Sequence, residues 1–266
     1  MTNLPDLPPA APEPDPWAGL RAFTAARIAL GRTGTSVPLR EALAFKLAHA
    51  HARDAVYSVL DTERLLAELA TLGLPVHQAS SRAQSRQEYL QRPDYGRQLA
   101  DASKASLAAE ADCDVALVLA DGLSATALNA HAVPLLRLLL PELRQSGLHL
   151  GPLVLAEQAR VALGDEIGHL LRARLVLVLI GERPGLSAPR SLGAYFTYAP
   201  RPGLTDEARN CVSNIRPAGL PYADAAARLA WLLGEALRRQ LSGVALKDET
   251  AATALGTAGA APGTTS

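Results

Sequence analysis

A run of six apolar residues at positions 175–180 restricts the fold of this chain more than any other feature of its sequence. Strands that are buried on both faces of a parallel sheet have continuous apolar sequence of this kind. The run stops at Gly-Glu-Arg-Pro-Gly-Leu, residues 181–186. Open α/β sheets bind ligands in the crevice beyond the carboxyl ends of their strands. Glu182 therefore lies where a sheet of this type would bind a ligand.

Apolar runs and helical patterns alternate from residue 112 onward. The expected strands lie at residues 115–120, 153–156, 175–180 and 194–198, and the expected helices lie at residues 125–144, 165–172 and 222–240. Strands that alternate with helices at this spacing indicate parallel βαβ units. We therefore predict an α/β fold in which a helical N-terminal region is followed by a Rossmann-like parallel-sheet domain over residues 112–248.

The chain before residue 112 lacks these strand-like runs. Apolar residues recur with a period near 3.6 in three segments, which predicts helices at residues 17–30, 38–56 and 62–72, and residues 80–96 are expected to form a turn and a helix. Residues 17–111 are thus expected to be entirely helical.

The two ends of the chain have compositions that do not form a core. Residues 1–16 include six prolines, and residues 249–266 are mostly Ala, Gly and Thr. Neither segment can bury enough apolar surface to offset the entropy lost on ordering. We expect a disordered arm at residues 1–16 and a disordered tail at residues 249–266.

Charge and cysteine content argue against several classes of function. Lysine plus arginine equals aspartate plus glutamate at 26 each, so no long-range field favours nucleic acid, and we expect no nucleic-acid partner. The two cysteines, Cys113 and Cys211, occur in no metal-binding pattern, which fits a reducing compartment and predicts no metal site. The sequence contains neither a secretory signal nor an apolar stretch long enough to span a membrane. We expect a cytoplasmic protein without membrane contact.

Three residues remain open to more than one role. Ser124 follows a predicted strand and begins a predicted helix, as the nucleophile of an α/β hydrolase does, but Thr126 replaces the closing glycine of G-x-S-x-G. A helix N-cap is the simpler role for Ser124. Cys211 could be a nucleophile only with a base nearby in space. Glu182 could contact a ligand or pair with Arg183. A stand-alone hydrolase and a non-enzymatic small-molecule-binding module are thus the alternative functions.

Several motifs occur together in the chain. They are Gly-Arg-Thr-Gly at residues 31–34, Lys-Leu-Ala-His-Ala-His-Ala-Arg-Asp-Ala-Val at 46–56, Ser-Arg at 81–82, Tyr-Leu-Gln-Arg-Pro-Asp at 89–94, Asp-Gly-Leu-Ser-Ala at 121–125, Gly-Glu-Arg-Pro-Gly-Leu at 181–186 and Cys-Val-Ser-Asn-Ile at 211–215. In their order and spacing they resemble the small (light) subunit of ethanolamine ammonia-lyase, over residues 15–248.

The resemblance implies a subunit of a carbon–nitrogen lyase, the adenosylcobalamin-dependent enzyme that converts ethanolamine to acetaldehyde and ammonia. In that family the small subunit is not catalytic alone. The large subunit, a β/α barrel, holds the substrate, and adenosylcobalamin lies at the interface of the two. The resemblance therefore implies a large-subunit partner and a higher hetero-oligomer, either free in the cytoplasm or within a bacterial microcompartment.

The resemblance also implies three cobalamin contacts, at Val161, Glu182 and Cys211, and no catalytic residue in this chain. A carboxylate can accept hydrogen bonds from the corrin amide groups, while Val and Cys offer small apolar contacts. The sequence lacks the D-x-H-x-x-G motif that supplies a histidine to cobalt. The lower cobalt ligand is therefore expected to be the benzimidazole of the cofactor itself.

Overall fold

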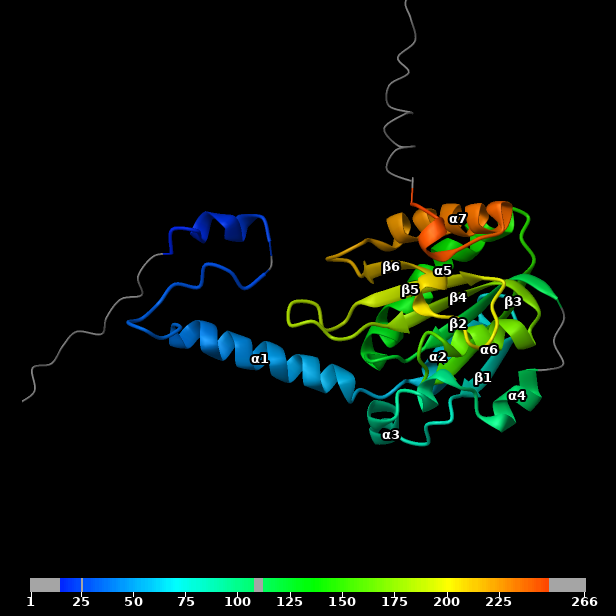
Figure 1. The fold of residues 1–266 in the computed structure, drawn as a ribbon, viewed down its shortest axis with the longest axis horizontal. Helices are drawn as coiled ribbons and strands as arrows, with labels where there is room; N and C mark the ends of the chain where they lie inside the picture. The colour runs from blue at the N-terminus through cyan, green and yellow to red at the C-terminus, as the bar shows by residue number, and fades with distance from the viewer. Residues whose placement is uncertain (1–14, 25, 108–111, 249–266) are drawn as a thin grey trace, which may run out of the picture.

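The computed structural model describes residues 15–24, 26–107 and 112–248. A six-stranded sheet lies at the centre of its main body (Figure 1). Residues 1–14 of the expected arm and the expected tail at 249–266 lie outside these ranges. The strands are β1 (Val76–Ser80), β2 (Cys113–Ala120), β3 (Leu150–Glu157), β4 (Ala173–Gly181), β5 (Leu192–Tyr198) and β6 (Arg209–Ile215). Their order across the sheet is β1-β3-β2-β4-β5-β6.

The four strands β1, β3, β2 and β4 are parallel, which confirms the predicted α/β class. The last two strands depart from the expected parallel arrangement, because β5 runs antiparallel to β4, and β6 runs antiparallel to β5. Only residues 182–191 connect β4 to β5, and they contain no helix that could return the chain for a parallel strand. The sheet is therefore mostly parallel, with an antiparallel extension at one edge.

Helices cover both faces of the sheet. One face packs against α2 (Thr62–Ala70), α5 (Ala125–Gln145) and α7 (Tyr222–Arg239), and the other packs against α4 (Asp101–Leu107) and α6 (Leu163–Leu170). Alternate residues of a strand point to opposite faces, so Leu117 lies in the first core and Val118 in the second. Short 3-10 helices lie at Ala18–Ala22, Tyr95–Arg97, Asp206–Ala208 and Gly243–Ala245. No helix of the described residues is both long and apolar enough to cross a membrane.

The N-terminal region differs from its prediction in two places. Helices α1 (Leu39–Val56) and α2 are confirmed, as is a helix α3 (Arg86–Gln91) after the turn, but β1 pairs with β3, so the region is not entirely helical. The helix expected at residues 17–30 is also wrong, since only Ala18–Ala22 forms a 3-10 helix. Trp17 and Phe23 are exposed, and an apolar face without packing does not stabilise a helix. The division of the chain between residues 111 and 112 stays a prediction.

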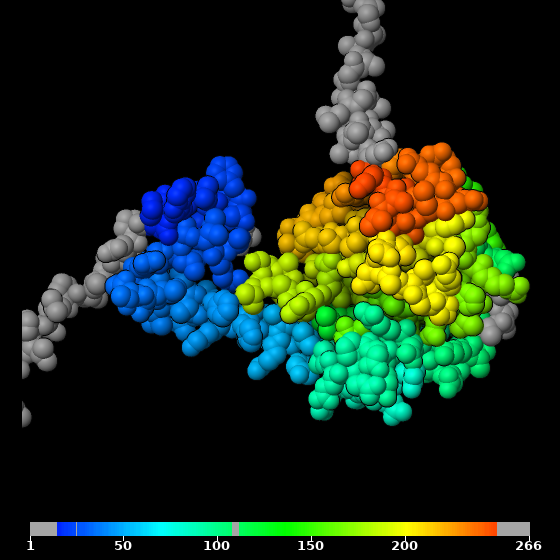
Figure 2. Space-filling view, viewed as in Figure 1, coloured from blue at the N-terminus to red at the C-terminus, as the bar shows by residue number. Residues whose placement is uncertain are grey.

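Helix α1 projects from the body of the molecule (Figures 1 and 2). Ala55, near its carboxyl end, is the only residue of α1 that is buried. The segment before α1 folds back beside it and approaches the loop between β4 and β5, where the Arg27 guanidinium donates a hydrogen bond to the Leu186 carbonyl over 3.4 Å. The segment before α1 and the carboxyl edge of the parallel strands therefore lie on the same side of the molecule.

Candidate functional site

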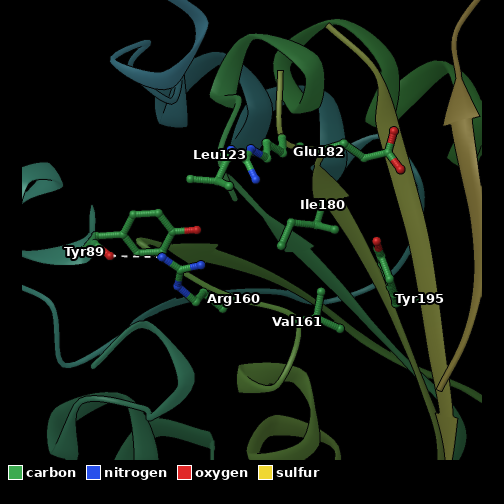
Figure 3. Close-up of a pocket in the computed structure, with 9 residues that line it drawn as sticks. Tyr89, Leu123, Arg160, Val161, Ile180, Glu182 and Tyr195 are labelled. Atoms are coloured by element: carbon green, nitrogen blue, oxygen red, sulfur yellow. Dashed lines mark hydrogen bonds between the residues drawn. The ribbon is translucent and has the colours of Figure 1, made fainter. Parts of the chain in front are cut away.

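The carboxyl ends of β2 and β4 form the topological switch point of the sheet. After β2 the chain forms β3 on one side of β2, and it then crosses over to form β4 on the other side. The connections that follow the adjacent strands β2 and β4 therefore run toward opposite edges of the sheet. Crevices at such points are the usual ligand sites of open α/β sheets. A pocket of about 430 Å³ lies here, which we call the switch-point pocket (Figure 3). It is lined by Tyr89, Leu123, Arg160, Val161, Ile180, Gly181, Glu182, Arg183 and Tyr195.

Two glycine-containing turns meet at the base of this pocket. The Leu123 N–H donates to the Gly181 carbonyl at 3.0 Å, which joins the turn after β2 to the end of β4. A Cβ atom added to Gly181 would lie 2.1 Å from the Ser124 carbonyl oxygen, and one added to Gly122 would lie 2.3 Å from the Gly181 oxygen. The motifs at residues 121–125 and 181–186 therefore need glycine because their backbones touch.

Val161 reaches the pocket on the loop between β3 and α6, and Asp121 holds this loop in place. The buried Asp121 carboxylate accepts hydrogen bonds from the backbone N–H groups of Gln158 and Ala159, each at 3.0 Å. Burial raises the pKa of Asp121 to about 6, while these two N–H groups and the guanidinium of Arg86 act to lower it. The carboxylate is thus ionised at neutral pH and fixes the start of the loop that carries Val161.

Tyr89 forms the inner wall of the pocket between two arginines. Its ring lies 4.7 Å from the guanidinium carbons of both Arg86 and Arg160, and its hydroxyl donates to the Ala159 carbonyl at 3.3 Å. Burial raises the pKa of Tyr89 to about 12, so the phenol stays neutral. Tyr89 begins the motif at residues 89–94, and the polar residues that follow at 91–94 gave no signal of its burial, so no role could be predicted for it.

Glu182 lies at the end of β4, where Figure 3 shows its carboxylate above the hydroxyl of Tyr195. Its Oε2 accepts a hydrogen bond from the Asn214 N–H at 3.2 Å. Within the described part of the chain, Glu182 forms no ion pair with Arg183. The carboxylate therefore has an orienting contact from β6 and retains further lone pairs for a ligand in the pocket.

Cys211 lies beside the pocket rather than in its lining. It is paired with Tyr195 across the β5–β6 ladder, and the residue is exposed. Although the residue is exposed, desolvation by the surrounding protein atoms raises the pKa of the Cys211 thiol, and a hydrogen bond from Tyr195 acts to lower it. The thiol is protonated at neutral pH, which disfavours Cys211 as the nucleophile of a hydrolase. The structure thus brings Val161 and Glu182 into one pocket and places Cys211 next to its Tyr195 wall.

Ser124 does not have the geometry of a hydrolase nucleophile. It occupies the N-cap position of α5, but its side chain does not form the expected capping hydrogen bond. Ser124 is completely buried, and its hydroxyl donates to the Pro189 carbonyl at 3.2 Å. A nucleophile elbow exposes its serine at the top of the sheet. The Thr126 N–H in the first turn of α5 instead donates a hydrogen bond to the Ser58 hydroxyl at 3.1 Å.

Comparison with known proteins supplies the decisive observation. The family model described as ethanolamine ammonia-lyase light chain (EutC) matches residues 14–247. The chain belongs to this family. The small subunit of ethanolamine ammonia-lyase from Bradyrhizobium diazoefficiens is 58% identical over 246 residues, which cover 91% of this chain and 94% of that protein. The small subunit from Rhodopseudomonas palustris is 57% identical over 87% of this chain and 89% of that protein. The small subunit from Ralstonia nicotianae is 53% identical over 93% of this chain and 94% of that protein.

The match confirms the resemblance drawn from the short motifs, and the motifs acquire a structural explanation. Those at residues 89–94, 121–125 and 181–186 all contribute residues to the wall or base of the switch-point pocket. Arg160 and Tyr195 line the same pocket, but no short motif pointed to them. A signal for Asp121 was present in the sequence, since it directly follows an apolar strand at the edge where ligands bind.

Proposed function

We propose that this chain is the small subunit of an adenosylcobalamin-dependent ethanolamine ammonia-lyase and that it binds part of the cofactor while supporting a catalytic large subunit. The observation that carries the proposal is the meeting of Val161 and Glu182, from two distant motifs, in one pocket at the switch point of a sheet. The membership of the chain in the small-subunit family supplies the substrate and the partner.

The residues of the pocket fit one edge of a corrin ring. Corrin side chains carry amide groups, and Glu182 offers acceptor oxygens at the pocket mouth. Gly193 lies so close that an added Cβ atom would be 3.0 Å from the Glu182 side chain, so this glycine leaves room for the carboxylate. Val161 and the Cys211 edge add small apolar contacts. Bound adenosylcobalamin would supply the radical chemistry, and the part of this chain is to bind and orient the cofactor.

The surface of α1 supports a large-subunit partner. Leu39, Leu43 and Leu47 recur at intervals of four, which aligns them along one face of the helix, and they are 74%, 54% and 59% exposed. A helix that projects from the body with an exposed apolar stripe is a typical protein-binding surface. Because the hydrogen bond of Arg27 joins the segment before α1 to the loop after β4, a protein seated on α1 would also reach the mouth of the pocket. The catalytic subunit that completes the cofactor site is the occupant we propose.

Reconstitution tests this function. The purified chain should release no ammonia from ethanolamine, and ammonia release should appear after it is mixed with a large subunit and adenosylcobalamin. Omitting any one of the three components serves as the control. Turnover by the chain alone would contradict the proposal and favour an autonomous enzyme. We propose that the active species is a higher hetero-oligomer, in the cytoplasm or in a bacterial microcompartment. Sedimentation of the same mixture measures its size.

A further inference from the structure

Arg86 joins three segments that are distant in the sequence. Its Nε donates to the Val56 carbonyl at 2.7 Å, at the last residue of α1. Its Nη1 donates to the Gly122 carbonyl at 2.8 Å and lies 3.6 Å from the carboxylate of Asp121. The side chain is only 17% exposed. One guanidinium thus connects the end of the projecting helix to the turn at the base of the switch-point pocket.

The loop that Asp121 holds adopts a strained backbone conformation. Gln158 has φ of 51°, in the left-handed region that side chains with a Cβ atom rarely occupy, and its Oε1 is buried without a hydrogen-bond partner among the described residues. Strain of this kind persists only where the surroundings enforce it, and it occurs preferentially at functional sites. The two hydrogen bonds from the loop to Asp121 supply that enforcement.

The far end of the loop is fixed by α3 and the segment that follows it. The Arg160 N–H donates to the Gly96 carbonyl at 2.8 Å, and the Arg160 guanidinium donates to the Tyr89 carbonyl at 3.3 Å. Tyr89 in turn is stacked against Arg86. Val161 therefore follows a loop that is anchored at its first residues by Asp121 and at its last by α3, and Arg86 contacts both anchors.

We propose that Asp121 and Arg86 are positioning residues for the cofactor contact at Val161, and that Arg86 couples this contact to the end of helix α1. Neither side chain lines the pocket, so both act through the loop. The inference rests on the proposed function, because it concerns how this chain positions its own contact with the cofactor. Docking of a partner on α1 and binding of cobalamin at the pocket then stabilise one another through Arg86.

Equilibrium binding of adenosylcobalamin to the assembled two-subunit complex tests the inference. Asp121→Asn keeps the size of the side chain but turns an NH2 group toward one of the two backbone donors. It should raise the Kd about 10-fold or more, since a hydrogen bond to a charged group is lost. Turnover at saturating cofactor should change much less. Arg86→Met should raise the Kd for cobalamin and also weaken assembly with the large subunit.

Asp114→Asn is the matched control. Asp114 lies at the opposite end of β2, where its carboxylate accepts hydrogen bonds from the His149 N–H at 2.9 Å and from Arg174 at 2.8 Å. Its substitution removes a comparable pair of contacts far from the pocket and should leave the Kd for cobalamin unchanged. An equal rise in Kd for Asp114→Asn would show that general loss of stability is responsible, and it would overturn the positioning role.

The remaining outcomes separate this inference from the proposed function. An unchanged Kd for Asp121→Asn, together with a raised Kd for Glu182→Ala, would overturn the positioning role while leaving the cofactor site in place. A wild-type complex that binds no adenosylcobalamin would contradict the proposed function itself. If Arg86→Met raised the Kd but left assembly with the large subunit unaltered, only the coupling to α1 would be overturned.

Discussion

The carboxylate of Glu182 accepts a hydrogen bond from the backbone N–H of Asn214, with 3.2 Å between Oε2 and N. This contact joins the loop after β4 to the end of β6, and so connects two motifs that are about thirty residues apart in the sequence. Asn214 has φ of 59°, a left-handed conformation that is uncommon for a residue with a Cβ atom. Glu182 is therefore held by the edge strand, and its orientation depends on β6 as well as on its own loop.

Cofactor affinity should fall as the pH falls through about 6, because Asp121 takes up a proton in this range. Protonation converts one of its acceptor oxygens into a donor, which weakens the hold on the loop before Val161. Among the described residues, Arg86 and Tyr89 of α3 are the charged and titratable neighbours of Asp121, and the raised pKa of Tyr89, about 12, keeps it neutral near pH 6. The Kd of the complex for adenosylcobalamin, measured from pH 5 to 8, should lose this inflection in Asp121→Asn.

The effect of Asp121 on global stability has the opposite sign. Its pKa in the folded protein is raised above the ordinary value of 3.8, so the folded state binds the proton more tightly than the unfolded state. The contribution of Asp121 to the free energy of unfolding is therefore largest at low pH and is lost as the pH rises through about 6.

Weaker cofactor binding at pH 5 with identical pH profiles for wild type and Asp121→Asn would contradict the role of this carboxylate.

The apolar stripe of α1 should control assembly. The double substitution Leu43→Glu and Leu47→Glu places two charges on the exposed face of the helix, and burial of unpaired charges against a partner is unfavourable. Co-purification with the large subunit should be lost, while thermal unfolding of the isolated chain should change little. Leu138→Glu, at an exposed leucine of α5, is the control and should assemble normally. Equal loss of assembly in this control would refute a specific role for α1.

Substitution of Gly181 should destabilise the chain. The added methyl group of Gly181→Ala would overlap the Ser124 carbonyl and the Asp121 carbonyl, both of them backbone atoms that cannot rotate away. Overpacking of this kind costs about 1–3 kcal/mol in the free energy of unfolding. Gly234→Ala in α7, where an added Cβ atom has no neighbour within 4 Å, should instead stabilise by about 0.5–1 kcal/mol through helix propensity. Urea denaturation of both variants measures the difference, and equal stability of the two would contradict the close contact.

The central part of the fold was predictable from the sequence because its strands are buried on both faces. The continuous apolar runs at 115–120 and 175–180 correspond to β2 and β4, and the helices between the strands follow from periodicity. The edge strands β1 and β6 were not predicted. Each mixes polar and apolar residues, since an edge strand has solvent on at least one side, and neither mixture resembles a buried run.

The candidate site was predictable only in part for a different reason. Glu182 follows an apolar strand, so its position at the ligand-binding edge could be inferred from the strand alone. The link from Arg86 to Asp121 and to the loop before Val161 depends on segments that meet only in the folded chain. Stacking of Tyr89 between two arginines likewise has no pattern in the sequence, because Arg160 is about seventy residues away.

The affinity of Glu182 variants for adenosylcobalamin shows whether the cofactor binds at the switch-point pocket. In the complex with the large subunit, Glu182→Ala leaves corrin amide donors unpaired and should cost about 1–3 kcal/mol of binding free energy. Glu182→Gln should be milder, because the amide retains one acceptor oxygen. Glu142→Ala, at an exposed carboxylate near the distal end of α5, serves as the control.

We expect a raised Kd and a raised apparent KM for adenosylcobalamin in Glu182→Ala, with kcat at saturating cofactor little changed, because the contact is equal in the ground and transition states. A Kd equal to that of the wild type and of Glu142→Ala would contradict the placement of cobalamin at this pocket.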